Sequence, residues 1–70
     1  MARVYSPVVG TLSLRYVDEG GIVEESEPVG EVESMKVMFA LLSPCRGKVH
    51  WRYELGEIVD ENDAIAEITP

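Results

Sequence analysis

The sequence is poor in several kinds of residue, and each shortage excludes a class of protein. Its 70 residues include one cysteine, Cys45, so no internal disulfide can form and we expect a cytoplasmic protein. No apolar run could span a bilayer and no charged-then-apolar leader is present, which argues against a membrane partner. Only 6 Lys and Arg stand against 13 Asp and Glu, and a net charge of −7 argues against a nucleic-acid partner.

Helical periodicity is also missing, because no 3.6-residue pattern of apolar residues persists along the chain. Strand patterns take its place. Residues 10–14 alternate, with Leu12 and Leu14 on one face, and residues 29–34 and 37–42 each have the length and composition of a strand. Turn signals lie at residues 18–21 and 24–28. The sequence therefore predicts one small all-β domain over residues 1–70.

An internal repeat divides the chain into two halves. Ser6-Pro7-x-x-Gly10 matches Ser43-Pro44-x-x-Gly47 at a spacing of 37, and at that spacing Arg15-Tyr16 falls on Arg52-Tyr53 and Leu14 falls on Trp51. One residue is then dropped, and the spacing becomes 36 for four more sites of identity: Gly20 with Gly56, Ile22-Val23 with Ile58-Val59, Glu25 with Glu61, and Glu31 with Glu67.

The repeat predicts the architecture. Neither half can bury its apolar strand faces alone, so the two must pack together. We expect a flattened β-barrel or sandwich of two four-stranded antiparallel sheets with pseudo-two-fold symmetry. The turn at Met35-Lys36 joins the halves, and the equivalent point of the second half is Thr69-Pro70. The turn and the termini should therefore lie at opposite ends of the molecule.

The junction itself is unusual. A two-residue hairpin turn prefers Gly, Asn or Asp, but here it consists of Met35 and Lys36. Met35 is a large apolar side chain where a polar one is usual. Lys36 is the only Lys or Arg between Arg15 and Arg46, and acids precede it. A surface lysine is most often only a solvated charge, but these features favour a functional role for Lys36.

Glu33-Ser34-Met35-Lys36 resembles the biotin-attachment motif Glu-(Ala/Ser/Val)-Met-Lys of the biotinyl domains of carboxylases. The resemblance covers nearly the whole chain and includes the following segments: Ser6-Pro7-x-x-Gly10, Gly20-Gly21-x-Val23, Gly47-x-Val49 and Ala64-Ile65-Ala66-Glu67-Ile68. The residue after the lysine is often Met or Leu in the family and is Val37 here, and Ser34 replaces the commoner Ala. The segment from Gly10 to Lys36 is too short for a protruding thumb, so the likeness is to thumbless domains, as in multidomain acetyl-CoA carboxylases.

The resemblance implies a fold and a function. The fold would be the biotinyl/lipoyl hammerhead, and Lys36 would be biotinylated by a biotin protein ligase that recognises Glu33, Ser34, Met35 and Val37 around it. Biotin on Lys36 would then carry a carboxyl group from biotin carboxylase to carboxyltransferase in an acyl-CoA carboxylase, with acetyl-CoA and fatty acid synthesis as the expected setting. The domain would supply position and effective concentration rather than catalysis, and in isolation it would be a monomer.

Two alternatives remain open from the residues. A lipoyl domain has the same fold, but its motif is Asp-Lys-Ala, and here Met35 stands where the acid would be. An unmodified β-sandwich adaptor would share every fold feature, and only the Met-Lys turn argues against it.

Other residues are assigned structural roles. Residues 37–42 are apolar on both faces, so the face turned away from the core is a candidate contact patch, to be tested by Phe39→Ser. The acids at residues 24–27 and 60–63 fall in separate turns and predict solvated loops rather than a metal site. Cys45 and His50 have no third residue to orient them as a nucleophile and base, and Trp51 is predicted to pack.

Overall fold

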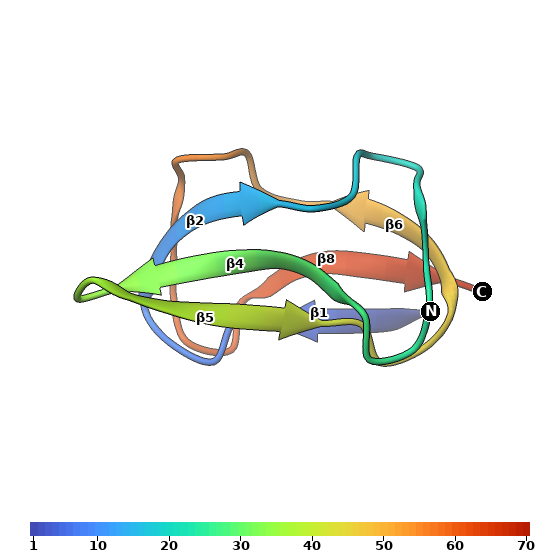
Figure 1. The fold of residues 1–70 in the computed structure, drawn as a ribbon, viewed down its shortest axis with the longest axis horizontal. Coiled ribbons are helices and arrows are strands. Elements are labelled where there is room, and N and C mark those ends of the chain that lie inside the picture. The colour runs from blue at the N-terminus through green and yellow to red at the C-terminus, as the bar shows by residue number, and fades with distance from the viewer.

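The computed structural model describes residues 1–70, and eight strands account for its regular structure (Figure 1). Their bounds are β1 Ala2–Tyr5, β2 Gly10–Arg15, β3 Ile22–Val23, β4 Pro28–Ser34, β5 Val37–Leu42, β6 Gly47–Trp51, β7 Ile58–Val59 and β8 Ala64–Thr69. No helix is present that could cross a bilayer. The predicted strands at residues 10–14, 29–34 and 37–42 are confirmed.

The strands form two antiparallel sheets, and the predicted all-β sandwich is confirmed. One sheet has the order β1-β8-β6-β3 and the other the order β5-β4-β2-β7. Each half of the chain contributes two strands to each sheet, since β1 and β3 join β6 and β8, while β2 and β4 join β5 and β7. Neither half therefore makes a sheet alone, and folding needs both halves.

The core lies between the sheets and is built from β-branched and leucine side chains on the inward faces. It consists of Val4, Leu12, Val23, Val29, Val32, Leu41, Val49, Val59, Ile65, Ala66 and Ile68. Such residues suit a pleated, half-buried strand surface. Two buried serines occupy equivalent places, and each hydroxyl donates to a carbonyl two residues on, Ser6 to Val8 and Ser43 to Cys45, both at 2.7 Å. Their burial is therefore compensated by hydrogen bonds.

The pseudo-two-fold relation extends to the loops. Gly20 N–H donates to the Val49 carbonyl at 2.8 Å, and Gly56 N–H donates to the Leu12 carbonyl at 2.8 Å. Ser26 and Asn62, which are 36 residues apart, both have positive φ, at 67° and 69°. The two halves therefore share their turn geometry as well as their strands.

The structure corrects one detail of the predicted repeat. The register between β2 and β4 shifts between Leu12 and Leu14, so Ser13 is a bulge residue that has no counterpart in β6. Arg15 pairs with Gly30 as Trp51 pairs with Ala66. Trp51 is therefore equivalent to Arg15, not to Leu14 as the repeat suggested. The alignment of Arg15-Tyr16 with Arg52-Tyr53 is wrong, because the dropped residue lies before these pairs rather than after them.

Arg15 and Trp51 meet at the seam between the halves. The Arg15 guanidinium carbon lies 4.7 Å from the centre of a Trp51 ring. Trp51 Nε1 donates to the Val17 carbonyl at 2.8 Å, and the Arg15 guanidinium donates to the Tyr53 carbonyl. Each side chain thus bonds to the loop that follows β2 or β6 in the other half. The prediction that Trp51 packs is confirmed, since it lies half-buried against the core.

The β4–β5 turn and the two termini lie at opposite ends of the long axis, as the repeat predicted (Figure 1). The molecule measures 33 × 17 × 16 Å, so the turn stands at the far end of an elongated body.

Candidate functional site

The Met35-Lys36 turn connects two well-paired strands. Ser34 pairs with Val37, and the register continues without interruption through Glu33–Met38 and Val32–Phe39. Met35 and Lys36 both have positive φ, at 51° and 66°. A two-residue connection with this backbone is a type I′ turn, which matches the right-handed twist of the flanking strands. The hairpin predicted from the sequence is confirmed.

In this turn two non-glycine residues have a backbone conformation that L-residues usually avoid. A non-glycine residue in the left-handed region costs roughly 1–2 kcal/mol. Only four non-glycine residues of the chain have positive φ, and Met35 and Lys36 are the only adjacent pair among them. Neither has the short polar side chain that makes this region tolerable for Asn. The strain is held by pairing on both sides, because β4 is bonded to β5 and to β2.

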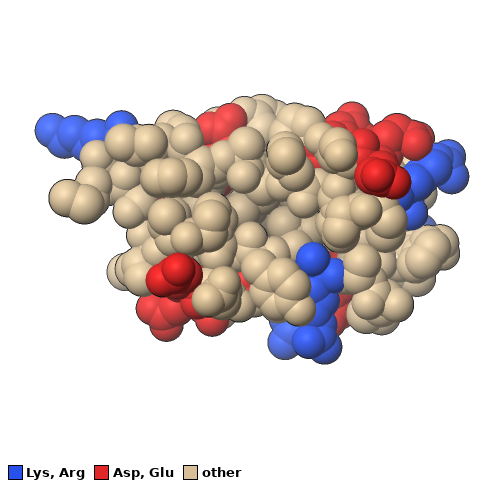
Figure 2. All heavy atoms as spheres, turned by 90° about the horizontal axis from the view of Figure 1, so that it is seen from below, with Lys and Arg blue, Asp and Glu red and all other residues tan.

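The side chains of the turn face solvent. Met35 is 94% exposed, and Lys36 is exposed and forms no ion pair. Figure 2 shows a basic side chain projecting alone from the end where this turn lies. The amine is therefore accessible from several directions and is not neutralised by a neighbouring carboxylate.

The structure brings the other predicted site residues together at this end. Ser34 is half-buried at the last position of β4, whereas Glu33 and Val37 are exposed on either side of it. Strand β2 supports the base of the hairpin, since a Cβ on Gly10 would overlap the Glu33 carbonyl oxygen. The turn is therefore supported by the close contact between the backbones of β2 and β4.

The other candidate residues form no second site. His50 Nδ1 lies 3.1 Å from Glu19, and Cys45 is half-buried in a turn with its carbonyl accepting from Ser43. The structure contains no group of acids, His and Cys that could hold a metal ion. The acidic loops are turns closed by their own carboxylates, as where Glu27 accepts from the Glu24 N–H at 2.8 Å.

The outward side of β5 is apolar and exposed, as the sequence suggested. Leu41 is buried and Phe39 half-buried on the inward side, while Met38, Ala40 and Leu42 are exposed on the outward side. Phe39 therefore does not belong to the outward patch, and Met38 and Leu42 are the appropriate positions for testing it.

Sequence reasoning missed the contacts of Glu19. Its carboxylate accepts from the Trp51 backbone N–H at 2.7 Å and lies beside His50. The pKa of Glu19 is lowered, first by the Trp51 hydrogen bond and then by the His50 contact. Glu19 lies in a loop 32 residues from Trp51, and no local pattern connects the two.

Two tyrosines bind carboxylates and were also missed. Tyr16 donates to Glu31, and Tyr53 donates to Asp63 at 3.0 Å. The pKa of each phenol is raised, chiefly because its hydrogen bond to the carboxylate favours the protonated form.

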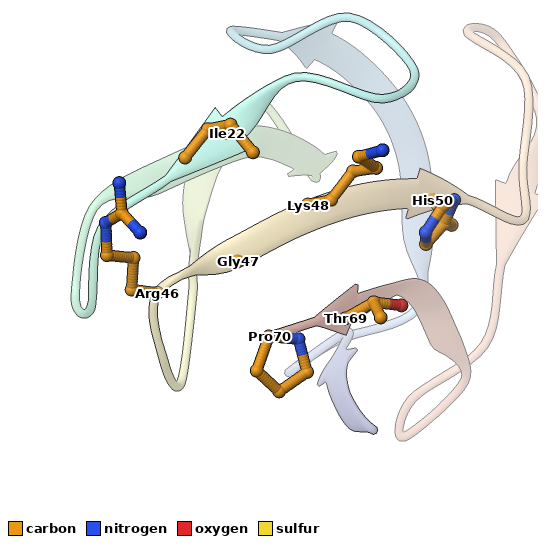
Figure 3. A pocket seen from close by; sticks show the side chains of 7 residues that line it. All are labelled: Ile22, Arg46, Gly47, Lys48, His50, Thr69 and Pro70. Carbon is orange, nitrogen blue, oxygen red and sulfur yellow. The ribbon is translucent and has the colours of Figure 1, made fainter.

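A pocket of about 320 Å³ lies on the sheet β1-β8-β6-β3, at the end away from Lys36 (Figure 3). It is lined by Ile22, Arg46, Gly47, Lys48, His50, Thr69 and Pro70. Of its basic side chains, Arg46 is already paired with Glu24 at 2.9 Å and His50 with Glu19. Because the pocket lies at the opposite end of the molecule, it is separate from the Lys36 turn.

Comparison with known protein families identifies the fold. The family model described as "Biotin-requiring enzyme", which covers biotin and lipoyl domains, matches residues 2–68. The chain belongs to this family. Domains of the family carry a covalently attached biotin, with lipoyl as the other group that they accept. No curated protein sequence matches this chain.

Two solved structures contain a region with a similar fold. The chain is similar to a region of the urea carboxylase of Kluyveromyces lactis, with a TM-score of 0.87 and 26% identity over 96% of this chain. It also resembles the fold of a region of a succinylglutamate desuccinylase/aspartoacylase of Rhodobacter sphaeroides, with a TM-score of 0.77 and 24% identity over 96% of this chain. It spans 6% of the first protein and 21% of the second.

The biotin-lipoyl domain has a group at its tip that suits a covalent biotin. Attachment through an amide needs a primary amine that a modifying enzyme can enclose. The Lys36 amine is free of ion pairs and stands on a projecting turn, and the only other lysine, Lys48, lies within β6. The turn therefore fits the group that the family carries.

Proposed function

We propose that Lys36 is the attachment point of biotin and that the domain is a biotin carboxyl carrier. The observation that supports this is the exposed, unpaired amine on a strained type I′ turn, within the sequence Glu33-Ser34-Met35-Lys36. When bound, biotin accepts a carboxyl group at one active site and releases it at another. The domain itself is a non-catalytic carrier that presents this end to biotin carboxylase and then to carboxyltransferase.

The attachment step needs a biotin protein ligase and biotinyl-adenylate. A lysine amine is protonated at neutral pH, so the ligase must first remove a proton from Nζ of Lys36. The amine then attacks the biotinyl carbonyl carbon, the amide C–N bond forms, the C–O bond to the phosphate breaks and AMP leaves. Met35 and Val37 offer the ligase apolar contacts beside the amine, while Glu33 and Ser34 complete the recognised segment.

We also propose the acceptor of the carboxyl group. A thumbless carrier of this size suits an acyl-CoA carboxylase, and acetyl-CoA in fatty acid synthesis, in the cytoplasm, is the acceptor that we favour. The likeness to a region of urea carboxylase makes urea a second candidate. Incubating the biotinylated protein with its carboxylase components and labelled bicarbonate would separate them, since acetyl-CoA and urea give different products.

Intact mass after co-expression with the cognate ligase tests the attachment site. The chain has two lysines, so Lys48→Arg is a matched control for Lys36→Arg. The wild type and Lys48→Arg should gain one biotinyl group, and Lys36→Arg should gain none while keeping its fold. A lipoyl adduct on Lys36 would instead make this a lipoyl carrier. A chain that stays unmodified with an active ligase would be an adaptor.

A further inference from the structure

The chain has one pocket, and none lies at the equivalent place on the other sheet. The strand registers define which positions are equivalent, and four of the lining positions differ in chemistry between the two sheets. The pairs are Arg46 against Val9, Lys48 against Thr11, His50 against Leu14, and Thr69 against Glu33. The pocket is therefore not a property of the repeat, and its chemistry belongs to one sheet alone.

These differences give the pocket a positive charge. Arg46 and Lys48 line it and no Asp or Glu does, whereas the equivalent place holds Glu33 and no Lys or Arg. The chain as a whole has a net charge of −7, so the pocket has the opposite sign to the rest of the molecule. Charges of one sign that line a concave site raise the local concentration of the oppositely charged ligand. The pocket is therefore suited to an anion.

Lys48 is the central cation of the pocket. It lies on β6 and pairs across the sheet with Ile22 of β3 and Thr69 of β8 (Figure 3). Its side chain is exposed and forms no ion pair. An ammonium group has three N–H donors and no acceptor. These donors are thus available to an anionic ligand in the pocket.

The bases on either side of Lys48 interact with acids that do not line the pocket. Arg46 Nε donates to Glu24 at 2.9 Å, and His50 Nδ1 lies 3.1 Å from Glu19. The contact with Glu24 engages only Nε, and a guanidinium carries further N–H donors on its Nη atoms. Arg46 can therefore donate to a second acceptor without losing its ion pair.

The spacing of the three bases limits what can bind. Arg46, Lys48 and His50 stand at alternate positions, so their side chains leave the same side of the strand about 7 Å apart. A single small ion at Lys48 can reach one neighbouring base but cannot contact Arg46 and His50 together. The anionic group of a ligand is therefore best placed at Lys48, beside Arg46.

The pocket has room for more than a bare ion. Its volume of about 320 Å³ is at the lower end of the range of about 300–1,000 Å³ that small-molecule sites occupy. Ile22 and Pro70 line it beside the bases and offer apolar surface. A ligand that fills the pocket therefore combines an anionic group with a small organic part.

We propose that this pocket binds a small organic phosphate. A phosphate group carries nearly two negative charges at neutral pH, which matches the two cations Lys48 and Arg46. The Thr69 hydroxyl can donate to a third phosphate oxygen, and the organic part lies against Ile22 and Pro70. The site goes beyond the carrier function proposed above, because it lies at the opposite end of the molecule from Lys36.

Titration of the ¹⁵N-labelled protein at constant ionic strength tests the site, with phenyl phosphate as the probe. The amide signals of Gly47, Lys48 and Thr69 should shift and saturate with a Kd on the order of 1 mM, since exposed ion pairs each contribute little. The signals of Met35 and Lys36 should not move. Inorganic phosphate lacks the ring and benzoate has only one charge, so each should bind about threefold or more weakly.

The two lysines of the chain provide matched variants. Lys48→Gln should raise the Kd about fivefold or more, because it removes the central cation. Lys36→Gln changes the net charge by the same amount at the other end, where salt screens it from the pocket, and should leave the Kd within about 1.5-fold. Lys48→Arg keeps the charge and should retain most of the affinity. Thermal unfolding verifies that each variant folds.

Four results would overturn the proposal. One is the absence of saturation over the range that fills a millimolar site, and another is equal weakening by Lys48→Gln and Lys36→Gln. The third is equal affinity for inorganic phosphate and phenyl phosphate, which would leave no role for an organic part. The fourth is tighter binding of a short peptide with alternating glutamates, which would assign the pocket to carboxylates of a protein partner.

Discussion

The two halves of this biotin-lipoyl domain have one backbone plan and different side chains at its centre. Arg15 in the first half occupies the place of Trp51 in the second, and each binds a carbonyl of the opposite half. Burying Trp51 removes apolar surface from water, whereas burying Arg15 leaves Nε without a hydrogen-bond partner. Equivalent positions therefore contribute unequally to stability, and the asymmetry can be measured.

Substitution at the seam should give the largest effect. Trp51→Ala removes packing, the hydrogen bond to Val17 and the contact with Arg15, and should lower the free energy of unfolding by about 3 kcal/mol. Arg15→Met keeps much of the packing and removes the unpartnered Nε, so it should cost about 1 kcal/mol or less. Urea unfolding followed by circular dichroism measures both. Equal losses would mean that the two positions are energetically equivalent.

Gly10 and Gly47 are equivalent in the two halves, so substitutions at them allow the two ends of the molecule to be compared. A Cβ at Gly47 would lie 2.5 Å from the Thr69 carbonyl oxygen, and one at Gly10 would overlap the Glu33 carbonyl oxygen. Each Gly→Ala change should cost about 2 kcal/mol, the usual range for overpacking. Only Gly10→Ala should also shift the amide NMR signals of Met35 and Lys36 and slow biotinylation. If Gly47→Ala had the same effect on the turn, β2 would not be its particular support.

The junction turn should respond in the opposite direction. Met35→Gly removes one left-handed non-glycine residue and should raise the free energy of unfolding by about 1 kcal/mol. The same change removes the apolar side chain beside Lys36 and should lower the rate of biotinylation. As a control, Asn62→Gly relieves a positive φ elsewhere and should leave modification unchanged. A Met35→Gly protein modified at the normal rate would argue against a role for Met35 in recognition.

The smallest expected effect is a pH dependence of stability that comes from Glu19 in the first half. The lowered pKa of Glu19 means that its carboxylate stabilises the fold above the unfolded value near 4.5, and that this contribution is lost as the pH falls through the folded pKa. Glu19→Gln should therefore flatten the acid side of the stability–pH curve, with little change in its slope at neutral pH. A control is Glu25→Gln, since Glu25 is exposed in a turn. Identical acid slopes for wild type and Glu19→Gln would contradict the assignment.

Much of this molecule could be predicted from its sequence. Strand alternation and turn residues are local signals, and the repeat can be detected because the two halves share identical residues. The strands near residues 10–14, 29–34 and 37–42, the two-sheet architecture and the Met35-Lys36 hairpin follow from those patterns. The equivalence of Arg15 with Trp51 did not, because the identity of Arg15-Tyr16 with Arg52-Tyr53 concealed the Ser13 bulge. A one-residue slip reverses which face a side chain occupies, so this error also set the exposed Leu14 against Trp51, which packs on the core.

The contacts of Glu19 could not be predicted for a different reason. A loop carboxylate that binds a strand 32 residues away depends on how the sheets stack, and no neighbouring residue records it. The role that we propose for Lys36 is easier to reach from the sequence, since a turn without Gly or Asn is unusual in the sequence itself.

The contact between Arg15 and Trp51 also allows unfolding to be followed by the intrinsic fluorescence of the protein. Trp51 is the only tryptophan and lies half-buried, bonded to Val17 and stacked on Arg15. Its fluorescence should change when the halves separate, because water then reaches the indole. The Lys36 turn is bonded to neither Trp51 nor Arg15, so events at the tip should leave the emission spectrum unaltered. Unfolding of the carrier could thus be followed without a label while a partner occupies the far end.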